Sequence, residues 1–204
     1  MPRVSKEHSE ARRQQILAGA RRCFAANGFH APSMQELLTE IGLSPGAFYR
    51  YFSGKEELVS TIAAEALASV TQSLVTYLNP QDPPPLRDLL GGLPGAPVET
   101  LRDPELNRLI IQVWAEGLRD EELSKVLHNG MLRLADLLAE TLSVHRRRGE
   151  LPADADPAAC ARVIIAALQG YLLQRAAFGV DEPEVFASGL RSLFPAATSA
   201  DQDR

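Results

Sequence analysis

Apolar residues recur every three to four positions along most of this chain, which is the spacing of amphipathic α-helices. The first such pattern runs from about Glu10 to Asn27, where several arginines fall off an apolar stripe. No segment alternates apolar and polar residues as a strand does, so the sequence predicts an all-α protein. Residues 1–9 are polar and are expected to be mobile, either as a frayed terminus or as an arm that contacts DNA through Arg3 and Lys6.

Two short helices are predicted next, joined by a tight turn. Ser33 and Glu36 have the spacing of a capping box, so a helix is expected to begin there. Its apolar face consists of Met34, Leu37, Leu38 and Ile41. Gly42 stands where a helix needs a left-handed end, after which Ser44 can cap a second helix with Pro45 at its first position.

The second of these helices is predicted to have a buried side and an exposed side. Phe48 and Phe52 are four residues apart, so both are expected to point into a core. The faces that remain carry Pro45, Gly46, Ala47, Tyr49 and Arg50. Two short helices joined by a turn that contains glycine are typical of a helix-turn-helix, whose second helix enters the major groove of DNA.

A long helix is predicted after this motif, from a second capping-box spacing at Ser53 and Glu56 to about Leu78. Lys55 would lie in its first turn, where the helix macrodipole disfavours a cation by about 0.3–1 kcal/mol. Two interpretations stand at this point. Lys55 is either solvated and compensated by its acidic neighbours, or it contacts a phosphate that binds beside the helix end.

The rest of the chain is predicted to hold a break and four further helices. The break, residues 79–97, contains six prolines and three glycines and is interpreted as a flexible gate with one short helix at Leu86 to Leu90. Helices are then expected from Asp103-Pro104, from about Asp120 to Arg148, from Asp156-Pro157, and from Glu182-Pro183. The tail from about residue 196 is expected to be disordered.

The charge of the chain is unevenly distributed. The net charge is −5, but residues 1–50 hold seven Lys or Arg against four Asp or Glu, whereas residues 61–204 hold thirteen against twenty. A locally basic head on an acidic chain is compatible with nucleic-acid binding by the head alone. Arg146 to Arg148 are interpreted either as a basic last turn of their helix or as a second DNA contact.

Other kinds of chemistry find little support in the sequence. Cys23 and Cys160 lie far apart in predicted helices and are interpreted as free thiols. The four histidines show no metal-ligand spacing and no nucleophile or phosphate-loop motif occurs, so we expect no enzyme activity, no catalytic residue, no metal and no cofactor. The longest apolar run, Val163 to Leu168, is six residues, and the N-terminus lacks a signal-peptide core. A cytoplasmic protein without a membrane partner is therefore expected.

With these residues in view, the chain resembles the TetR (tetracycline-repressor-like) family of bacterial transcriptional regulators. The resemblance is tightest from Ile16 to Leu58, and it rests on Phe24…Gly28-Phe29, on Leu37…Gly42-Leu43-Ser44-Pro45-Gly46-Ala47-Phe48-Tyr49-Arg50-Tyr51-Phe52 and on Lys55-Glu56-Glu57-Leu58. Further along, Gly149-Glu150-Leu151, Asp156-Pro157 and Gly170 are similar to the branch that includes choline-response regulators. The resemblance implies a three-helix DNA-binding domain, residues 1–54, and a helical domain, residues 55–204, that holds a ligand cavity and dimerises through its last two helices.

The same resemblance implies contacts with the DNA backbone. Ser33 and Gln35, at the start of the first short helix, resemble residues that contact phosphate or backbone. Tyr49 and Lys55 resemble the phosphate-contacting tyrosine and lysine of the family. For Lys55 the resemblance favours the phosphate interpretation over the solvated one.

The groove-facing surface that the resemblance implies is made of Ser44, Pro45, Gly46 and Ala47. Arg50 occupies a position that varies across the family, and an arginine there would pair best with guanine. Tyr51 departs from the family, which often has histidine at that position. Because Gly46 and Ala47 carry no side-chain donors, much of the specificity is expected to come from DNA shape.

The hypothesis from the sequence is a homodimeric repressor that a small apolar or amphipathic molecule releases from a palindromic operator. Candidate cavity residues are Trp114, His128, Met131 and Gln169, for each of which plain core or surface placement stays open. Candidate dimer-interface residues are Val163, Ala167, Tyr171, Phe186 and Leu190. The alternative is a helix-turn-helix module that a protein partner controls or that has no ligand.

Overall fold

The computed structural model describes residues 6–29, 31–96 and 103–194, and every regular element in these ranges is a helix. The all-α prediction is therefore confirmed for the described chain. The N-terminal part, which we call the head, holds α1 (Lys6–Asn27), α2 (Met34–Ile41) and α3 (Pro45–Phe48). The linking helix is α4 (Lys55–Leu78). The remaining elements, which we call the body, are α5 (Leu86–Gly92), the 3₁₀ turn η1 (Leu93–Gly95), α7 (Pro104–Glu116), α8 (Glu121–Arg147), α9 (Pro157–Phe178) and α10 (Pro183–Leu193).

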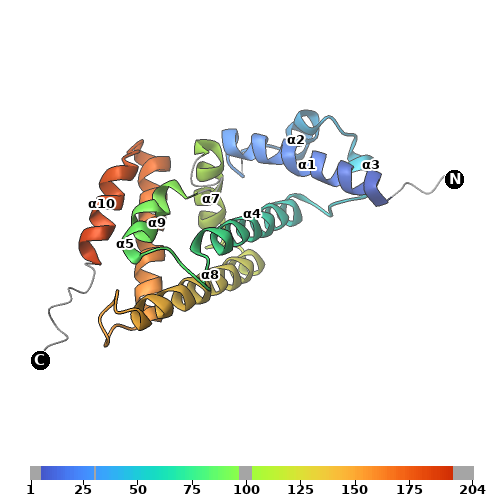
Figure 1. The fold of residues 1–204 in the computed structure, drawn as a ribbon. Helices are drawn as coiled ribbons and strands as arrows, with labels where there is room; N and C mark the ends of the chain where they lie inside the picture. Colours follow the sequence, from blue (N-terminus) through green and yellow to red (C-terminus); the bar gives the residue numbers. More distant parts are fainter. Residues whose placement is uncertain (1–5, 30, 97–102, 195–204) are drawn as a thin grey trace, which may run out of the picture.

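The helices form an elongated molecule with the head at one end (Figure 1). α4 runs from the head into the body, where it packs along α8. α9 packs against both α7 and α8, and α10 packs against α5 at the far end of the body. α1 also contacts α7. The head is therefore attached to the body directly as well as through α4.

The helix ends around the turn at Gly42 follow largely from local sequence. The capping box at α2 is confirmed, because Ser33 Oγ accepts the backbone N–H of Glu36 at 3.2 Å and the Glu36 carboxylate accepts the Ser33 N–H at 2.7 Å. Gly42 ends α2 with φ 74°, in the left-handed region that glycine adopts without strain. Ser44 is the N-cap of α3 and Pro45 its first residue, but the Ser44 side chain makes no capping hydrogen bond.

The N-terminal ends of two helices differ from the prediction. α1 begins at Lys6 rather than at about Glu10, so residues 6–9 are helical and not a mobile arm. At α4 the capping partner of Ser53 is Glu57 and not Glu56, because the Glu57 carboxylate accepts the Ser53 N–H at 2.6 Å and its hydroxyl at 2.7 Å. Arg3 of the expected arm and the expected disordered tail lie outside the described residues.

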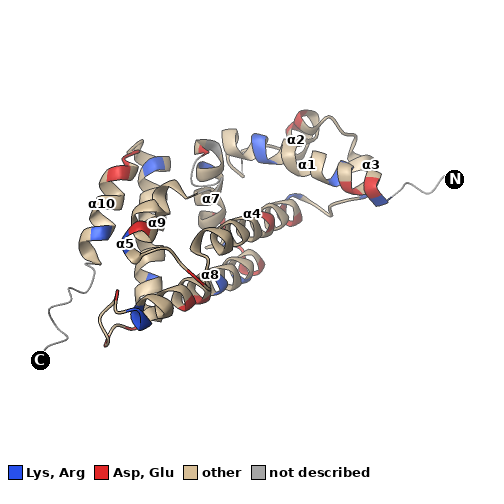
Figure 2. Cartoon of the chain, viewed as in Figure 1, with Lys and Arg blue, Asp and Glu red and all other residues tan. Residues whose placement is uncertain are grey.

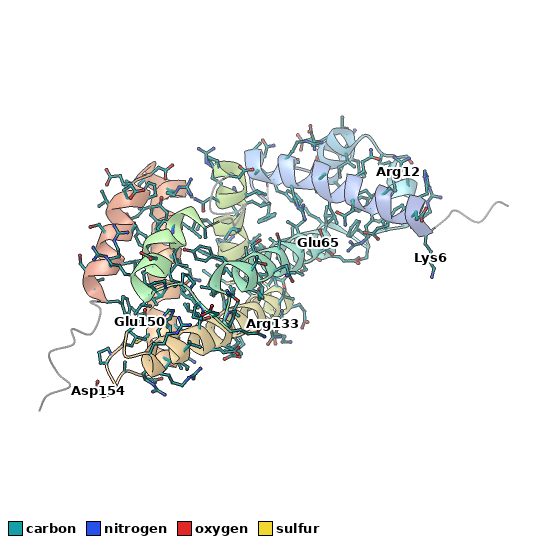
Figure 3. The ribbon with its side chains drawn as sticks, in the orientation of Figure 1. Lys6, Arg12, Glu65, Arg133, Glu150 and Asp154 are labelled. Atoms are coloured by element: carbon teal, nitrogen blue, oxygen red, sulfur yellow. The ribbon has the colours of Figure 1, made fainter. Side chains whose placement is uncertain are left out.

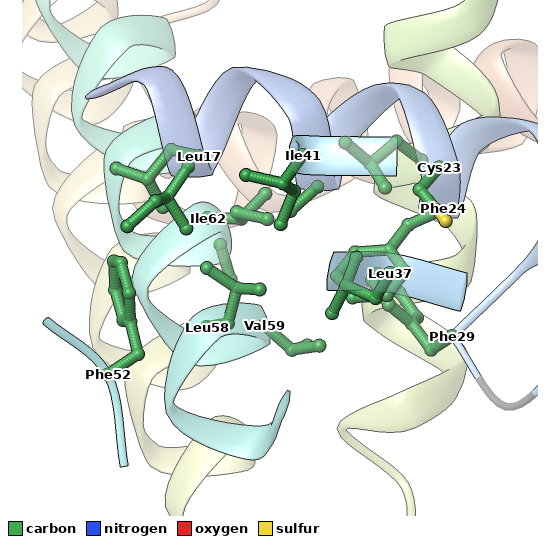
Figure 4. Packing of buried hydrophobic residues seen from close by; sticks show 14 of the residues in the cluster. Leu17, Cys23, Phe24, Phe29, Leu37, Ile41, Phe52, Leu58, Val59 and Ile62 are labelled. Atoms are coloured by element: carbon green, nitrogen blue, oxygen red, sulfur yellow. The ribbon is translucent and has the colours of Figure 1, made fainter. Parts of the chain in front are cut away.

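The head is built around a core of aromatic and aliphatic side chains (Figure 4). Phe48 and Phe52 are buried as predicted, with ring centroids 5.9 Å apart. Members of this core on α4 are Leu58, Val59, Ile62 and Ala63, and members on α7 are Leu109 and Val113. The first two turns of α4 therefore belong to the head, and the core runs without a break past the expected boundary at residue 54.

The proline-rich segment after α4 is packed and does not form the flexible gate that the sequence suggested. Leu86, Leu89 and Leu90 on α5 are buried in the body core, at 2%, 0% and 0% exposure. Arg148 ties the segment down, since its guanidinium donates to the Pro83 carbonyl oxygen at 2.7 Å and to Asp82 Oδ1 at 2.6 Å. These contacts favour a structural role for Arg148 over a second DNA contact.

A buried histidine lies where this segment meets the end of α8. His145 has no exposed surface, and its Nδ1 lies 3.3 Å from Glu150 Oε2 without a hydrogen bond to it. The same Glu150 oxygen accepts the backbone N–H of Leu86, the first residue of α5, at 2.6 Å. Glu150 therefore satisfies the start of α5, and the imidazole beside it is left with neither ring nitrogen hydrogen-bonded.

α4 is the one helix among the described residues that is long and apolar enough, by length and composition, to cross a membrane. Its first turns supply the head core, and Val70, Leu74 and Tyr77 pack in the body. Between them, Glu65 forms ion pairs with two arginines of α1. Each stretch of the helix thus has a partner within the protein.

Candidate nucleic-acid interface and cavity

The residues that the sequence assigned to DNA come from α2, from α3 with the residues that follow it, and from the start of α4. Ser33 and Gln35 are exposed at the start of α2, and the start of α3 exposes Ser44, Pro45 and Gly46. Tyr49 and Arg50 follow α3 and are exposed, whereas Ala47, Tyr51 and Lys55 are half-buried. The turn at Gly42 joins these two helices and so places their exposed N-terminal ends on the same domain. Contact of each of these residues with DNA stays a prediction.

Tyr49 and Arg50 differ in how the head supports them. The Tyr49 ring packs edge-on against Phe48, with centroids 5.4 Å apart and an interplanar angle of 85°, and 54% of the residue is exposed. A core ring thus holds one side of Tyr49 while the other faces solvent. No described hydrogen bond or ion pair engages the Arg50 guanidinium within the described residues. Arg50 is therefore available to an external partner.

Lys55 has a contact that neither sequence interpretation included. Its ammonium donates to the carbonyl oxygen of Pro32 at 2.9 Å, which ties the first turn of α4 to the residue before the cap of α2. An ammonium has three N–H donors, so two remain for a phosphate. The contact also places a positive charge next to the N-terminal end of α2, where backbone N–H groups favour an anion.

The cations of the head lie mainly on α1 and at the start of α4, as Figure 2 shows. Within residues 1–50 they exceed the acidic residues, seven to four. Figure 3 labels Lys6 and Arg12 near the beginning of α1. At the start of α4, Lys55 is accompanied by Glu56 and Glu57, and the first turn of α8 is acidic as well (Figure 2). The distribution gives the head the sign that a nucleic-acid surface needs.

A cavity of about 190 Å³ lies within the body, and Arg21 of α1 reaches its wall from the head. Its wall is mostly apolar and comes from α4, α7, α8 and α9; among its residues are Val70, Leu74, Ile110, Trp114, Leu134 and Leu168. The polar side chains on the wall are few, and they include Arg21, Glu65, Ser69 and Gln169. Gln169 Nε2 lies 3.8 Å from the Met131 sulfur. A site of this composition suits a ligand that is largely apolar.

Three of the predicted cavity residues line this cavity, and one does not. Trp114, Met131 and Gln169 are on the wall. His128 is exposed on α8 and is not part of the wall, so its place in the candidate ligand set is withdrawn. Sequence reasoning missed Arg21 and Glu65. Glu65 carried a signal, since it interrupts the apolar stripe of α4 three residues after the buried Ile62.

Among the predicted dimer residues on α9 and α10, some are exposed on the single chain and others are buried within it. Val163 is 56% exposed, but Tyr171 and Leu190 are buried within the chain. The Tyr171 ring stacks on Phe186 at a centroid distance of 4.7 Å, so these two aromatics join α9 to α10 inside one protomer. Tyr171 and Leu190 are thus corrected to intramolecular core residues. The exposed large apolar side chains of the two helices are Val163, Leu173, Phe178, Val185 and Leu193.

The described part of the chain shows neither a candidate metal site nor a disulfide. No group of three or more His, Cys, Asp or Glu side chains is placed there to hold a metal ion. Cys23 and Cys160 are both free thiols. Burial raises the pKa of the Cys23 thiol, so the reactive thiolate is disfavoured.

Comparison with known proteins agrees with this geometry. Residues 16–62 match the model of the bacterial regulatory proteins of the tetR family, and residues 97–192 match that of the C-terminal part of BetI-type transcriptional repressors. The chain is 26% identical over 182 residues to the HTH-type transcriptional regulator UidR of Escherichia coli K12, covering 89% of this chain and 90% of the relative. A stretch of 65 residues is 46% identical to the HTH-type transcriptional repressor Rv1474c of Mycobacterium tuberculosis, covering 32% of this chain and 35% of that one.

The fold also matches solved structures. The structure of Salmonella enterica GusR superposes with a TM-score of 0.75 at 27% sequence identity, covering 95% of this chain and 97% of that one. Reduced NemR of E. coli superposes with a TM-score of 0.76 at 22% identity, covering 93% of this chain and 99% of that one. The similarity therefore extends over head and body together.

Proposed function

Because this chain belongs to the TetR family of bacterial transcriptional regulators, we propose that it is a homodimeric repressor that leaves its operator when a small molecule fills the cavity. The observation that carries the proposal is the pairing, on one chain, of an exposed helix-turn-helix with an apolar cavity whose wall includes α4, the helix that enters the head core.

The DNA-binding part of the proposal rests on the exposed start of α3. In a two-fold dimer, two such helices would enter successive major grooves about 34–36 Å apart on a near-palindromic operator. Arg50 would then read guanine, at about 1–3 kcal/mol of discrimination for a bidentate pair. Tyr49, Lys55, Ser33 and Gln35 would hold the phosphates on either side, which positions the helix without reading sequence.

The groove-facing residues of α3 themselves offer few side-chain donors. Ser44 is exposed, and its hydroxyl makes no capping bond within the chain, so it is available to DNA. Pro45, Gly46 and Ala47 present a smooth surface that allows close approach to a groove or a thymine methyl group. We therefore propose that DNA shape contributes a large part of the operator preference.

The proposed dimer would form through α9 and α10. Val163 and Leu173 on α9, together with Val185 and Leu193 on α10, leave apolar surface exposed on the single chain. A two-fold axis would place the same patch of each copy against the other and would cover these side chains. The small residues Gly170 and Gly189, whose missing Cβ atoms would meet nothing within 4 Å, leave room for a close approach.

Coupling between ligand and DNA would pass through α4. Ile62 and Ala63 belong to the head core and also line the cavity, so a ligand touches residues that hold the head in place. A ligand that favours one orientation of α4 lowers operator affinity by the same factor by which DNA lowers ligand affinity. The apolar wall favours this ligand-responsive form over the alternative of a module without a ligand.

The DNA-binding assignment is tested with duplexes selected from a random pool by the purified protein. Arg50→Ala should raise the dissociation constant by roughly 5- to 150-fold, corresponding to about 1–3 kcal/mol, and should relax the preference at one position of each half-site. Arg133, an exposed arginine on α8, provides the matched control, and Arg133→Ala should bind as the wild type does. Equal binding by all three proteins would remove Arg50 from the DNA interface.

A further inference from the structure

The end of the cavity nearest the head carries more positively than negatively charged side chains. Arg13 and Arg21 of α1 converge on Glu65 of α4, with Arg13 Nη1 3.0 Å from Oε1 and Arg21 Nη2 2.8 Å from Oε2. Figure 3 labels Glu65 on α4 where it faces α1. Two guanidinium groups against one carboxylate leave a net positive charge at this place. The side chains are 33%, 33% and 29% exposed, so this charge is partly shielded from water.

The two arginines differ in what else they contact. Arg13 lies over the Phe52 ring, 5.4 Å from its centroid, and is not on the cavity wall. Arg21 is on the wall together with Glu65. Among the described hydrogen bonds, Arg21 uses Nη2 alone. A guanidinium has five N–H donors in a planar fork, so Arg21 retains donors that suit a second carboxylate.

The remainder of the cavity sets the shape of the molecule that would reach Arg21. Apolar side chains such as Leu74, Leu134 and Leu168 make up most of the wall, and Trp114 adds an aromatic surface. The volume of about 190 Å³ is somewhat larger than the roughly 150 Å³ of an engineered apolar cavity that accepts benzene. The apolar body of the ligand should therefore be the size of a substituted ring or of a chain of about six to eight carbons.

We propose that the cavity takes a small apolar monocarboxylate, whose carboxylate binds Arg21 while its body fills the apolar part. This inference rests on the proposed function, because it specifies the ligand of the same cavity. A carboxylate on Arg21 competes with Glu65 for the guanidinium and weakens the ion pair that holds α1 on α4. Ligand binding and loosening of the head are thereby linked through one side chain.

The test compares probes that share a tail and differ in the head group. Octanoate, octan-1-ol and octylammonium are titrated into the full-length protein by calorimetry, with benzoate as an aromatic probe. Octanoate should bind about tenfold more tightly than octan-1-ol, because a carboxylate can form a bidentate ion pair with the Arg21 guanidinium whereas a hydroxyl offers a single uncharged acceptor. Octylammonium should bind more weakly than both.

Variants of Arg13 and Arg21 distinguish a direct contact between the ligand carboxylate and Arg21 from a general electrostatic attraction to the two arginines. Arg21→Gln should remove the preference for octanoate and bring the ratio of the octanoate and octan-1-ol affinities to about one. Arg13→Gln is the matched control, because Arg13 pairs with the same Glu65 but does not line the cavity, and it should keep the preference. Arg21→Lys, which retains the charge without the planar fork, should keep part of it and serves if Arg21→Gln fails to fold.

The possible outcomes distinguish this inference from the proposed function. Equal affinity for octanoate and octan-1-ol would overturn the carboxylate contact while leaving an apolar ligand site in place. Tighter binding of octylammonium would overturn it in favour of Glu65 as the contact. If no probe binds, the inference fails, whereas the Arg50→Ala experiment on DNA still stands or falls independently. An unchanged octanoate preference in Arg21→Gln would also contradict it.

Discussion

The Lys55 ammonium on α4 donates to the Pro32 carbonyl oxygen at 2.9 Å, across a gap of 23 residues in sequence. This contact accounts for a cation in the first turn of a helix, where the macrodipole is unfavourable. It also fixes the start of α4 relative to the start of α2. The residues proposed to hold DNA phosphates on the two helices, Ser33 and Lys55, are therefore positioned by the same hydrogen bond.

Replacement of Lys55 tests this double role. Lys55→Met keeps the length of the side chain but removes the hydrogen-bond donor. It should lower the free energy of unfolding by about 1 kcal/mol, because the lost hydrogen bond outweighs the gain from removing a cation at the N-terminal end of a helix. It should also weaken operator binding and reduce the salt slope by about one unit. Urea unfolding and DNA titration measure the two effects, and Lys55→Arg serves as the charge-retaining control. Unchanged DNA binding with lowered stability would confine Lys55 to a structural role.

Alanine substitution should lower the free energy of unfolding at Gly42, whereas at Gly46 it should leave this free energy unchanged or raise it. Gly42→Ala forces a Cβ into the left-handed region at φ 74° and should cost about 1 kcal/mol of stability, although its Cβ would meet nothing within 4 Å. Gly46 lies in α3 without a positive φ and also faces open space. Gly46→Ala should leave stability unchanged or raise it by up to about 1 kcal/mol.

The second readout for this pair is operator affinity. If the backbone at Gly46 approaches a groove closely, Gly46→Ala should lose affinity despite its intact stability. Gly42→Ala should lose affinity only at temperatures where its fold is impaired. Thermal unfolding and DNA titration on the same samples separate the two causes, and full affinity in Gly46→Ala would argue against close approach of α3 at that residue.

The buried His145 should make stability depend on pH. Burial lowers the pKa of His145, and the nearby Arg148 acts in the same direction, against the opposing effect of the Glu150 carboxylate. The imidazole therefore binds a proton less readily in the folded chain than in the unfolded chain, where it takes up a proton below about pH 6.5. Its contribution to stability is complete above that pH and is lost as the pH falls toward the lower folded value.

The measurement is urea unfolding at pH 7.5 and pH 5.5. Wild-type protein should lose up to about 1.4 kcal/mol more than His145→Leu between these values, which is the linkage limit for one group of pKa 6.5 in the unfolded chain. His128→Leu is the matched control, because His128 is exposed on the same helix. A loss in His145→Leu as large as in the wild type would place the pH dependence elsewhere.

The exposed side chains of α9 and α10 make a prediction about assembly. Val163→Glu would bring two like charges together across a two-fold interface, and it should shift the protein from dimer to monomer by more than tenfold in dissociation constant. Leu118, which is 88% exposed in the turn after α7, provides a control at which the same substitution should leave assembly unchanged. Sedimentation velocity over a range of concentrations reports both. A dimer of unchanged affinity in Val163→Glu would place the interface on another surface.

The sequence predicted the head more fully than the body, for a physical reason. The caps at Ser33 and Gly42 and the spacing of Phe48 and Phe52 depend on residues within a few positions of one another, so local chemistry determines them. In α9, apolar and small residues lie on most sides, and periodicity does not tell which side faces another helix. Tyr171 was therefore assigned to a dimer interface although it stacks on Phe186 of the same chain.

Two further differences come from contacts between distant parts of the chain. The proline-rich segment looked like a gate because Pro and Gly disfavour helix interiors, but the buried leucines of α5 outweigh that local preference. Arg21 and Glu65 are 44 residues apart, and no spacing in the sequence signals their pairing at the cavity. His128 failed as a cavity residue because polarity alone does not place a side chain on the inner face of a helix.

DNA binding by a two-fold dimer is tested most directly by fluorescence anisotropy with a selected duplex and a scrambled duplex of equal length. Titrations at several salt concentrations give the affinity, the specificity ratio and the number of chains per duplex. We expect one dimer per near-palindromic duplex, tighter binding to the selected sequence, and a logarithm of the affinity that falls with log salt by about 0.9 for each phosphate contacted. Equal affinity for both duplexes, or an affinity that does not change with salt, would contradict this expectation.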